Sequence, residues 1–295
     1  MPFVMLDGQL VHESQARVSV FDRSFLYGDG LFETLLIWNR RPFRWEQHWG
    51  RLQRGLGVLW LSLPFDHDTV VNQIARLLDA NQLNHGILRL QVSRGVGARG
   101  YSPPAKPNPV TIISTHPLEP VAPGQPQGWR LHTASFRLPP LGALASFKSC
   151  NKLLHVVARL EARERQADEA LLLDSEGHVA EAAAGNLFWW AGGQLHTPPL
   201  ATGALPGITR QVILELASRW NWKTQETLAG VEALRAAEGV FLTTSPMGVI
   251  EVLEIDGHPI QRSTVTQQCH AGYWALVARE SETRRCAPPN SLSPS

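Results

Sequence analysis

The strongest candidate for chemistry in this chain is one lysine among small and apolar residues. Lys148 stands in residues 145–154, which read Ala-Ser-Phe-Lys-Ser-Cys-Asn-Lys-Leu-Leu. The apolar residues that follow have helical spacing and predict a helix with one buried face; they are Leu153, Val156, Val157 and Leu160. A lysine held at such a junction loses hydration, which lowers its pKa and frees its amine to attack a carbonyl group. The simpler alternative is a solvated lysine near a helix start.

A carboxylate further along the chain is a candidate partner for this lysine. Glu181 precedes the string Ala-Gly-Asn-Leu-Phe-Trp-Trp at residues 184–190, and taken alone it is a solvated carboxylate at a strand end. With a lysine followed closely by asparagine, the string resembles the fold-type IV pyridoxal-phosphate enzymes. These are the branched-chain and D-amino-acid aminotransferases and aminodeoxychorismate lyase. The resemblance implies that Lys148 carries pyridoxal 5'-phosphate as a Schiff base and that Glu181 lies against the ring nitrogen of this cofactor.

Three further strings resemble the parts of this family that hold the cofactor phosphate. Residues 48–52 match the motif H-x-x-R-L, and the planar fork of Arg51 suits an oxyanion. Residues 206–210 read Pro-Gly-Ile-Thr-Arg at the start of a predicted helix, where free backbone amides attract anions. Residues 240–246 predict a strand that ends in hydroxyl groups. The resemblance implies phosphate contacts from Arg51, Ile208, Thr209, Thr244 and Ser245. Outside the family these would be a surface arginine, a helix start and a polar strand end.

Residues 93–104 form a glycine-rich stretch that contains a literal G-x-G-x-x-G. We reject a dinucleotide site, because that motif must open a helix and the following Tyr-Ser-Pro-Pro does not readily do so. A loop with two arginines suits a carboxylate instead, although a solvated basic loop is the simpler alternative. The string resembles the S-R-G-x-G-x-R-G-Y loop of bacterial aminodeoxychorismate lyases, whose substrate is a dicarboxylate. The resemblance implies substrate contacts from Arg94, Arg99 and Tyr101.

Residues 22–34 resemble the N-terminal family string D-R-x-x-x-Y/F-G-D-G-x-F-E-T and add Tyr27 and Phe32 as substrate-binding candidates. The resemblance implies a lyase that converts 4-amino-4-deoxychorismate to 4-aminobenzoate and pyruvate, a step of folate biosynthesis. The alternatives are a branched-chain or D-amino-acid aminotransferase and a non-catalytic ligand-binding relative. Two departures bear on this choice. Gly248 replaces an acidic residue of many aminotransferases, and Ser149-Cys150 replaces the His-Leu pair common in the lyases.

The elements around these motifs predict an α/β (α+β) chain. Strands are expected at 31–38, 86–92, 109–115 and 129–136, and helices at 45–59 and 67–82. Proline and glycine gather between 117 and 128, which predicts a linker there. The expected division is a smaller domain at 1–116, a larger cofactor-binding domain at 129–280 and a disordered tail at 281–295. The resemblance implies a D-amino-acid-aminotransferase-like fold with the cofactor in the cleft between the domains.

Length and composition are those of a soluble globular protein. The 295 residues are 43% hydrophobic and 18% charged. A formal charge of +1 argues against a nucleic-acid partner or an acidic membrane surface. No apolar run approaches the ~20 residues of a membrane span, and the first residues lack the basic region of a signal peptide.

The cysteine pattern completes these expectations. Cys150, Cys269 and Cys286 show no disulfide framework and no metal-ligand spacing. We therefore expect a reduced, cytoplasmic protein that needs no metal. The resemblance implies a homodimer that acts on a small amino substrate carrying one or more carboxylates.

Overall fold

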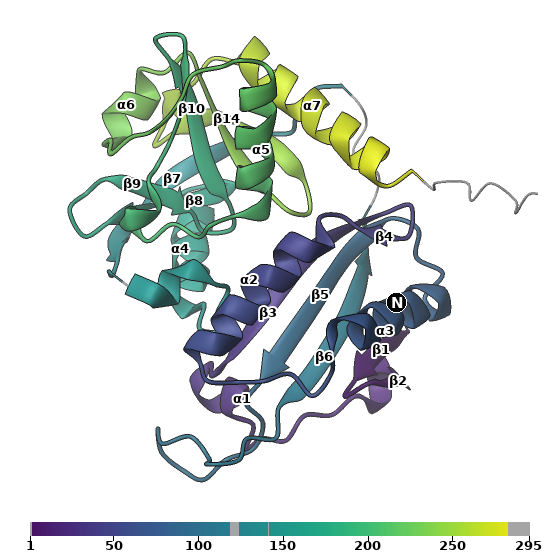
Figure 1. The fold of residues 1–295 in the computed structure, drawn as a ribbon. Coiled ribbons are helices and arrows are strands. Elements are labelled where there is room, and N and C mark those ends of the chain that lie inside the picture. The colour runs from purple at the N-terminus through teal and green to yellow at the C-terminus, as the bar shows by residue number, and fades with distance from the viewer. Residues whose placement is uncertain (1, 119–123, 141, 283–295) are drawn as a thin grey trace, which may run out of the picture.

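The computed structural model describes residues 2–118, 124–140 and 142–282, and these residues build two sheets, each with its own helices (Figure 1). The first sheet has six strands in the order β2-β1-β6-β5-β3-β4, and every neighbouring pair is antiparallel. The strands are β1 (Phe3–Leu6), β2 (Gln9–His12), β3 (Gly30–Trp38), β4 (Arg41–Pro42), β5 (Gly86–Ser93) and β6 (Val110–Pro117).

Two long helices cover the first sheet, and a short one precedes β3. They are α1 (Arg23–Tyr27), α2 (Trp45–Val58) and α3 (His67–Ala80). Apolar residues of α2 and α3 at helical spacing, such as Leu52 and Leu77, pack with Leu35 and Leu88 of the sheet in one buried core. This core fixes α2, which carries Arg51.

The second sheet has nine strands in the order β12-β11-β10-β13-β14-β7-β8-β9, with β15 paired to β14. Its pairs are antiparallel except β11–β12, β14–β7 and β7–β8, which are parallel. The strands are β7 (Gly128–Leu138), β8 (Glu169–Asp174), β9 (Val179–Ala182), β10 (Asn186–Ala191), β11 (Gln194–Thr197), β12 (Thr224–Glu226), β13 (Gly239–Thr244), β14 (Gly248–Ile255) and β15 (His258–Pro259).

Helices lie on both faces of the second sheet. They are α4 (Leu153–Glu164), α5 (Ile208–Arg219), α6 (Val231–Arg235) and α7 (Thr264–Glu280). Phe188 and Phe241 pack with α5 and α7, whereas the neighbouring Leu187 and Leu242 pack with α6. Successive strand residues point to opposite faces, so both faces of this sheet are buried.

The predicted mixed α/β fold is confirmed, and the predicted strands and helices coincide with β3, β5, β6, β7, α2 and α3. The predicted linker falls between the two sheets, but residues 119–123 lie outside the described residues. Most of the predicted tail, from residue 283 on, also lies outside them. The domain boundaries therefore remain a prediction. Within the described ranges no helix is both long and apolar enough to cross a membrane.

The predicted burial of the helix after Lys148 is wrong. The four apolar residues of α4 are exposed, at 69% for Leu153, 53% for Val156, 43% for Val157 and 46% for Leu160. The helix instead buries Ala158 and Ala162 against β7 and β8. Two alanines on one face let the helix backbone approach the sheet closely, and the bulky face is left on the surface.

The two sheets are joined by a packed contact at one end. Phe43, which follows β4, meets Tyr273 of α7 with ring centroids 5.7 Å apart, and both belong to one buried core. Arg44 forms ion pairs of 2.9 Å with Glu215 of α5 and 2.9 Å with Glu280 of α7. This contact fixes how the first sheet sits against the second.

Candidate active site

Lys148 is carried by the first sheet, although it follows β7 of the second sheet in the chain. Phe32 N donates to Lys148 O at 2.9 Å, and Cys150 N donates to Gly30 O at 2.9 Å. Leu31 and Ser149 form an antiparallel bridge between these bonds. The segment around Lys148 is therefore held to β3 by a single β-bridge and its two flanking hydrogen bonds, and Lys148 Nζ lies 5.1 Å from the centre of the Phe32 ring.

The surroundings of Lys148 favour its neutral amine. Burial, followed by the charge of Arg51, lowers the pKa of Lys148 to about 8, against the opposing influence of Glu33 and Glu181. An ordinary lysine has a pKa of ~10.4. At neutral pH the amine is thus far more often unprotonated than that of a solvated lysine, which suits attack on a carbonyl carbon.

Glu181 lies in β9 on the opposite, second-sheet side of the same cavity. The carboxylate is 8% exposed, and its Oε2 accepts from Leu205 N at 2.9 Å and from Asn186 Nδ2 at 3.4 Å. Asn186 Nδ2 also donates to Leu205 O at 2.8 Å. These bonds hold the carboxylate in one orientation, as a partner for a fixed ring nitrogen requires.

One cavity of about 310 Å³ brings the predicted cofactor residues together. Its walls include Lys148, Glu181, Arg51, Ile208, Thr209, Thr244 and Ser245, together with the substrate candidate Phe32. The first sheet and α2 supply Phe32 and Arg51, whereas the second sheet and α5 supply Glu181 and the residues around Thr209. The cavity therefore lies between the two parts of the chain, as the sequence predicts for the cofactor.

The start of α5 fits a phosphate group. Its N-cap residue Gly207 provides no side-chain cap, so the first amides of the helix are free for an anion. A side chain at Gly207 would collide with Asn186 Oδ1, which explains the glycine. The hydroxyl of Thr243, on the same cavity wall, is buried and has no partner among the described residues. Free amides and hydroxyls around one space are the donors that a phosphate needs.

Arg51 reaches this cavity as part of a buried ion-pair cluster. It donates to Glu33 through Nε at 2.8 Å and through Nη2 at 2.6 Å, and to Pro206 O through Nη1 at 2.9 Å. His48 Nδ1 lies 2.7 Å from the same carboxylate. Burial alone would raise the pKa of Glu33, but Arg51 and His48 outweigh it and lower the pKa to about 2. A guanidinium has five N–H donors, so two of them remain for an anion.

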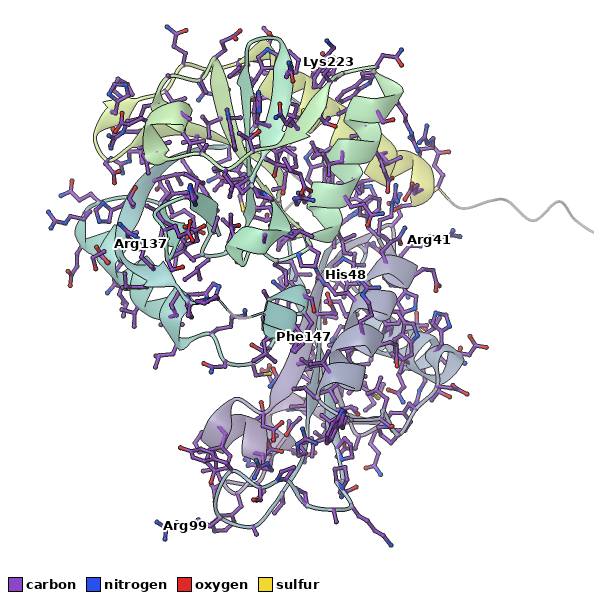
Figure 2. The ribbon with its side chains drawn as sticks, turned by 60° about the vertical axis from the view of Figure 1, so that its left-hand side comes forward. Arg41, His48, Arg99, Arg137, Phe147 and Lys223 are labelled. Carbon is purple, nitrogen blue, oxygen red and sulfur yellow. The ribbon has the colours of Figure 1, made fainter. Side chains whose placement is uncertain are left out.

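The structure separates the other substrate candidates from Lys148. Arg94 is buried, where it pairs with Asp29 at 2.8 Å and donates to Leu59 O at 2.9 Å. Arg99 lies on a loop at the far end of the first sheet, well away from Phe147, the residue before Lys148 (Figure 2). Tyr101 is 87% exposed on the same loop. None of these three residues lines the cavity of Lys148.

Tyr27 has an intermediate position. It lines a second cavity, of about 330 Å³, that adjoins the first. Its hydroxyl accepts from Gly100 N at 3.1 Å, and its ring contacts that of Tyr101 at a centroid distance of 5.5 Å. Tyr27 thus ties the arginine loop to the wall of this second cavity.

Several residues of the site received no role from the sequence. Glu33 and His48 stand inside quoted motifs, so their positions were visible but their link to Arg51 was not. Lys152 and His155 line both cavities, and Asn186 supports Glu181. For Lys152 and His155, the spacing from Lys148 at the start of a helix was the only available signal.

Comparisons with known proteins bear on this geometry. The model of the family described as amino-transferase class IV matches residues 30–255. A Methanocaldococcus jannaschii protein named "Putative branched-chain-amino-acid aminotransferase" is 34% identical over 263 residues, covering 89% of this chain and 91% of that protein. Aminodeoxychorismate lyase of Bacillus subtilis is 30% identical over 256 residues, covering 86% of each.

Solved structures show the same likeness. Branched-chain amino acid aminotransferase of Escherichia coli superposes with a TM-score of 0.88 at 26% identity, covering 96% of this chain and 97% of that chain. The similarity thus extends over both sheets and the cavity between them.

Proposed function

This chain belongs to the class IV amino-transferase family, whose cofactor is pyridoxal 5'-phosphate, and on that premise we propose that it is a lyase acting on 4-amino-4-deoxychorismate. The products are 4-aminobenzoate and pyruvate. The observation that carries the proposal is the placement of Lys148 and Glu181 on opposite walls of one cavity. The choice of a lyase is supported by the string at residues 93–101 and by the likeness to the Bacillus subtilis lyase.

Each wall of the cavity has a distinct task in this proposal. Glu181 would hold a proton at the ring nitrogen of the cofactor, and Arg51, the amides of Ile208 and Thr209, and the hydroxyls of Thr244 and Ser245, which line the cavity, would hold its phosphate. When bound, the cofactor supplies an electron sink for the charge released from a C–H bond. Anchoring both ends fixes the reacting carbon near the lysine, which lowers the entropic cost of the reaction.

Lys148 moves the proton in this proposal. Its neutral amine would hold the cofactor through the aldehyde group of the cofactor, and with the substrate bound Nζ would take the proton from the substrate ring carbon. The C–O bond to the enolpyruvyl group then breaks and the ring becomes aromatic. Return of the proton to the methylene carbon of the released enolpyruvate gives pyruvate, so atoms and charges balance.

Gly248, where many aminotransferases have an acidic residue, supports the lyase over the aminotransferase. Its φ of +68° favours glycine, and an added Cβ would lie 2.5 Å from the ring of Tyr273. The acidic residue of many aminotransferases therefore has no room at this position. The aminotransferase alternative is supported by the likeness to the Methanocaldococcus jannaschii protein and the Escherichia coli structure.

A homodimer, in the cytoplasm, is part of the same proposal. The exposed apolar face of α4 supports it, and so does an apolar group on residues 18–26, which includes Val20 at 64% and Phe25 at 75% exposure. Burying such surfaces against a second copy is favourable. Because the loop of Arg99 lies away from its own cavity, a carboxylate held by Arg99 would belong to the site of the second copy.

The test is turnover of aminodeoxychorismate by purified protein loaded with cofactor, with no amino acceptor present. The expected result is stoichiometric pyruvate and 4-aminobenzoate, with borohydride fixing the cofactor mass on Lys148. Absence of pyruvate, with cofactor absorbance lost on adding amino acids and restored by keto acids, would establish the aminotransferase instead. Failure to bind the cofactor at all would favour the non-catalytic relative.

A further inference from the structure

The second cavity shares a wall with the cavity of Lys148. Lys152, His155, Glu181 and Leu205 line both spaces. The remainder of the second cavity is largely apolar and includes Leu59, Leu138, Leu144, Phe147 and Leu154. A substrate that reacts at Lys148 can therefore extend an apolar or unsaturated body into this space past Lys152 and His155.

Lys152 is the uncommitted cation of this wall. It is partly buried at the N-cap of α4, and within the described ranges its amine makes no hydrogen bond and no ion pair within 4.0 Å. The other cations nearby are engaged, since Arg51 is paired with Glu33 and Arg94 with Asp29. A cation that has lost water without gaining a partner is unfavourable until an anion binds.

Neighbouring groups suit a carboxylate beside Lys152. His155 Nδ1 is buried and has no partner among the described residues, and His155 Nε2 lies 3.8 Å from Glu181 Oε1. With the proton on Nδ1, the ring can donate a second hydrogen bond to a carboxylate. Of the acidic groups of the second cavity, Asp29 is balanced by Arg23 and Arg94 at 2.8 Å each. Glu181 accepts from the neutral donors Leu205 N and Asn186 Nδ2, and in the proposed function its charge would be balanced by the protonated ring nitrogen of the cofactor. Burial lowers the pKa of Lys152, whereas the charge of Glu181 opposes this shift.

We propose that Lys152 binds a second carboxylate of the substrate, so that the chain selects dicarboxylic amino substrates over monocarboxylic ones within a single subunit. The inference rests on the proposed function, because it needs the substrate amine to react at Lys148. It deepens that function by placing the distal carboxylate at the shared wall. Selection of dicarboxylic substrates by Lys152 would not depend on the loop that carries Arg99.

The test measures binding of two unreactive probes to the cofactor-loaded protein by calorimetry. The probes are isophthalate, with two carboxylates on one ring, and benzoate, with one. Wild type should bind isophthalate at least about tenfold more tightly, since a charge-assisted hydrogen bond contributes about 1.5–3 kcal/mol and 1.4 kcal/mol is tenfold. Lys152→Met should remove this preference by weakening isophthalate binding more than benzoate binding, and Lys152→Arg should restore most of it.

Lys223→Met is the matched control. Lys223 is exposed and lies at the far end of the second sheet from Phe147, which lines the second cavity (Figure 2). This variant should keep the wild-type preference. Equal weakening of both probes in Lys152→Met would show that Lys152 only supports the cavity structurally.

Two outcomes separate failure of the inference from failure of the proposed function. If wild type binds the cofactor at Lys148 but shows no preference for isophthalate, the inference is wrong and the function stands; this outcome needs no variant. If borohydride fixes no cofactor on Lys148, the proposed function is wrong and the inference fails with it.

Discussion

Two cations line the cavity, and they differ in how their charges are balanced. We call the side that carries Arg51 the balanced wall and the side that carries Lys152 the unbalanced wall. Arg51 is 2% exposed and is neutralised in advance by Glu33, which His48 also contacts. Lys152 is only partly buried and has no ion-pair partner in the described residues. The charge of Arg51 is thus neutralised before any ligand binds, whereas the charge of Lys152 is neutralised only when an anionic ligand binds. A permanent cofactor suits the first arrangement and a substrate that comes and goes suits the second.

Removal of the Lys148 amine should have the largest effect, and it tests whether this amine carries the reaction for which both walls hold the ligands. Lys148→Ala should lower turnover by at least about 100-fold, because a positioned acid–base group contributes about 10²–10⁴-fold. The cofactor should still bind through the Arg51 wall, but borohydride should no longer attach it. Pyruvate release and the mass of the reduced protein measure both effects. Attachment at another lysine in this variant would show that Lys148 was wrongly assigned.

Breaking the balanced wall should be the next largest effect. Glu33→Gln leaves the Arg51 charge buried without a counter-charge, which costs about 3–5 kcal/mol when one partner of a buried pair is removed. Urea unfolding at pH 7 measures the free energy of unfolding. Glu46→Gln is the control, since the Glu46 side chain is 73% exposed. A change below about 1 kcal/mol in Glu33→Gln would contradict the view that this wall is held by its ion pair.

The same carboxylate predicts an acid-sensitive contribution to stability. The pKa of Glu33 falls from 4.5 to about 2 in the folded protein, so its stabilising effect is complete above pH 4.5 and is lost as pH falls toward 2. At about 1.4 kcal/mol per unit the contribution is about 3 kcal/mol. The difference in unfolding free energy between wild type and Glu33→Gln, measured from pH 6 to pH 2, should shrink over this interval. A difference that stays constant with pH would be inconsistent with a paired Glu33.

The smallest effect is expected at the unbalanced wall. Lys152→Met removes a cation that has no partner, so the free energy of unfolding should stay within about 1 kcal/mol of wild type or rise. Urea unfolding of the ligand-free protein is the measurement. A loss above about 2 kcal/mol would mean that Lys152 has a structural partner and would remove the contrast between the walls.

The sequence predicted which residues line the balanced wall, but it did not predict the ion pairs between them. Local strings identified Arg51 and the Ile208–Thr209 pair, and the structure places them in one cavity with Lys148. The role of Glu33 was hidden, because a pairing between β3 and α2 depends on how the helix packs on the sheet. Arg94 likewise matched a substrate string, yet it pairs with Asp29.

The error at α4 has a similar cause. Helical spacing correctly predicted a helix beginning at Leu153, but spacing alone does not say which face meets the sheet. The alanine face lies inward, and the bulkier residues remain exposed. A pattern within one segment therefore predicts the type of element, whereas its partner depends on the rest of the chain.

The β-bridge at Lys148 links the two parts of this chain beside the cavity. Lys148 follows β7 in the chain, yet its carbonyl oxygen accepts from Phe32 N, and the nearby Cys150 N donates to Gly30 O, both residues of the first sheet. A chimaera that joined the first part of one relative to the second part of another at the linker would bring its reactive lysine to a foreign strand. Recombination between relatives should therefore succeed only where the residues around β3 and Lys148 are inherited together.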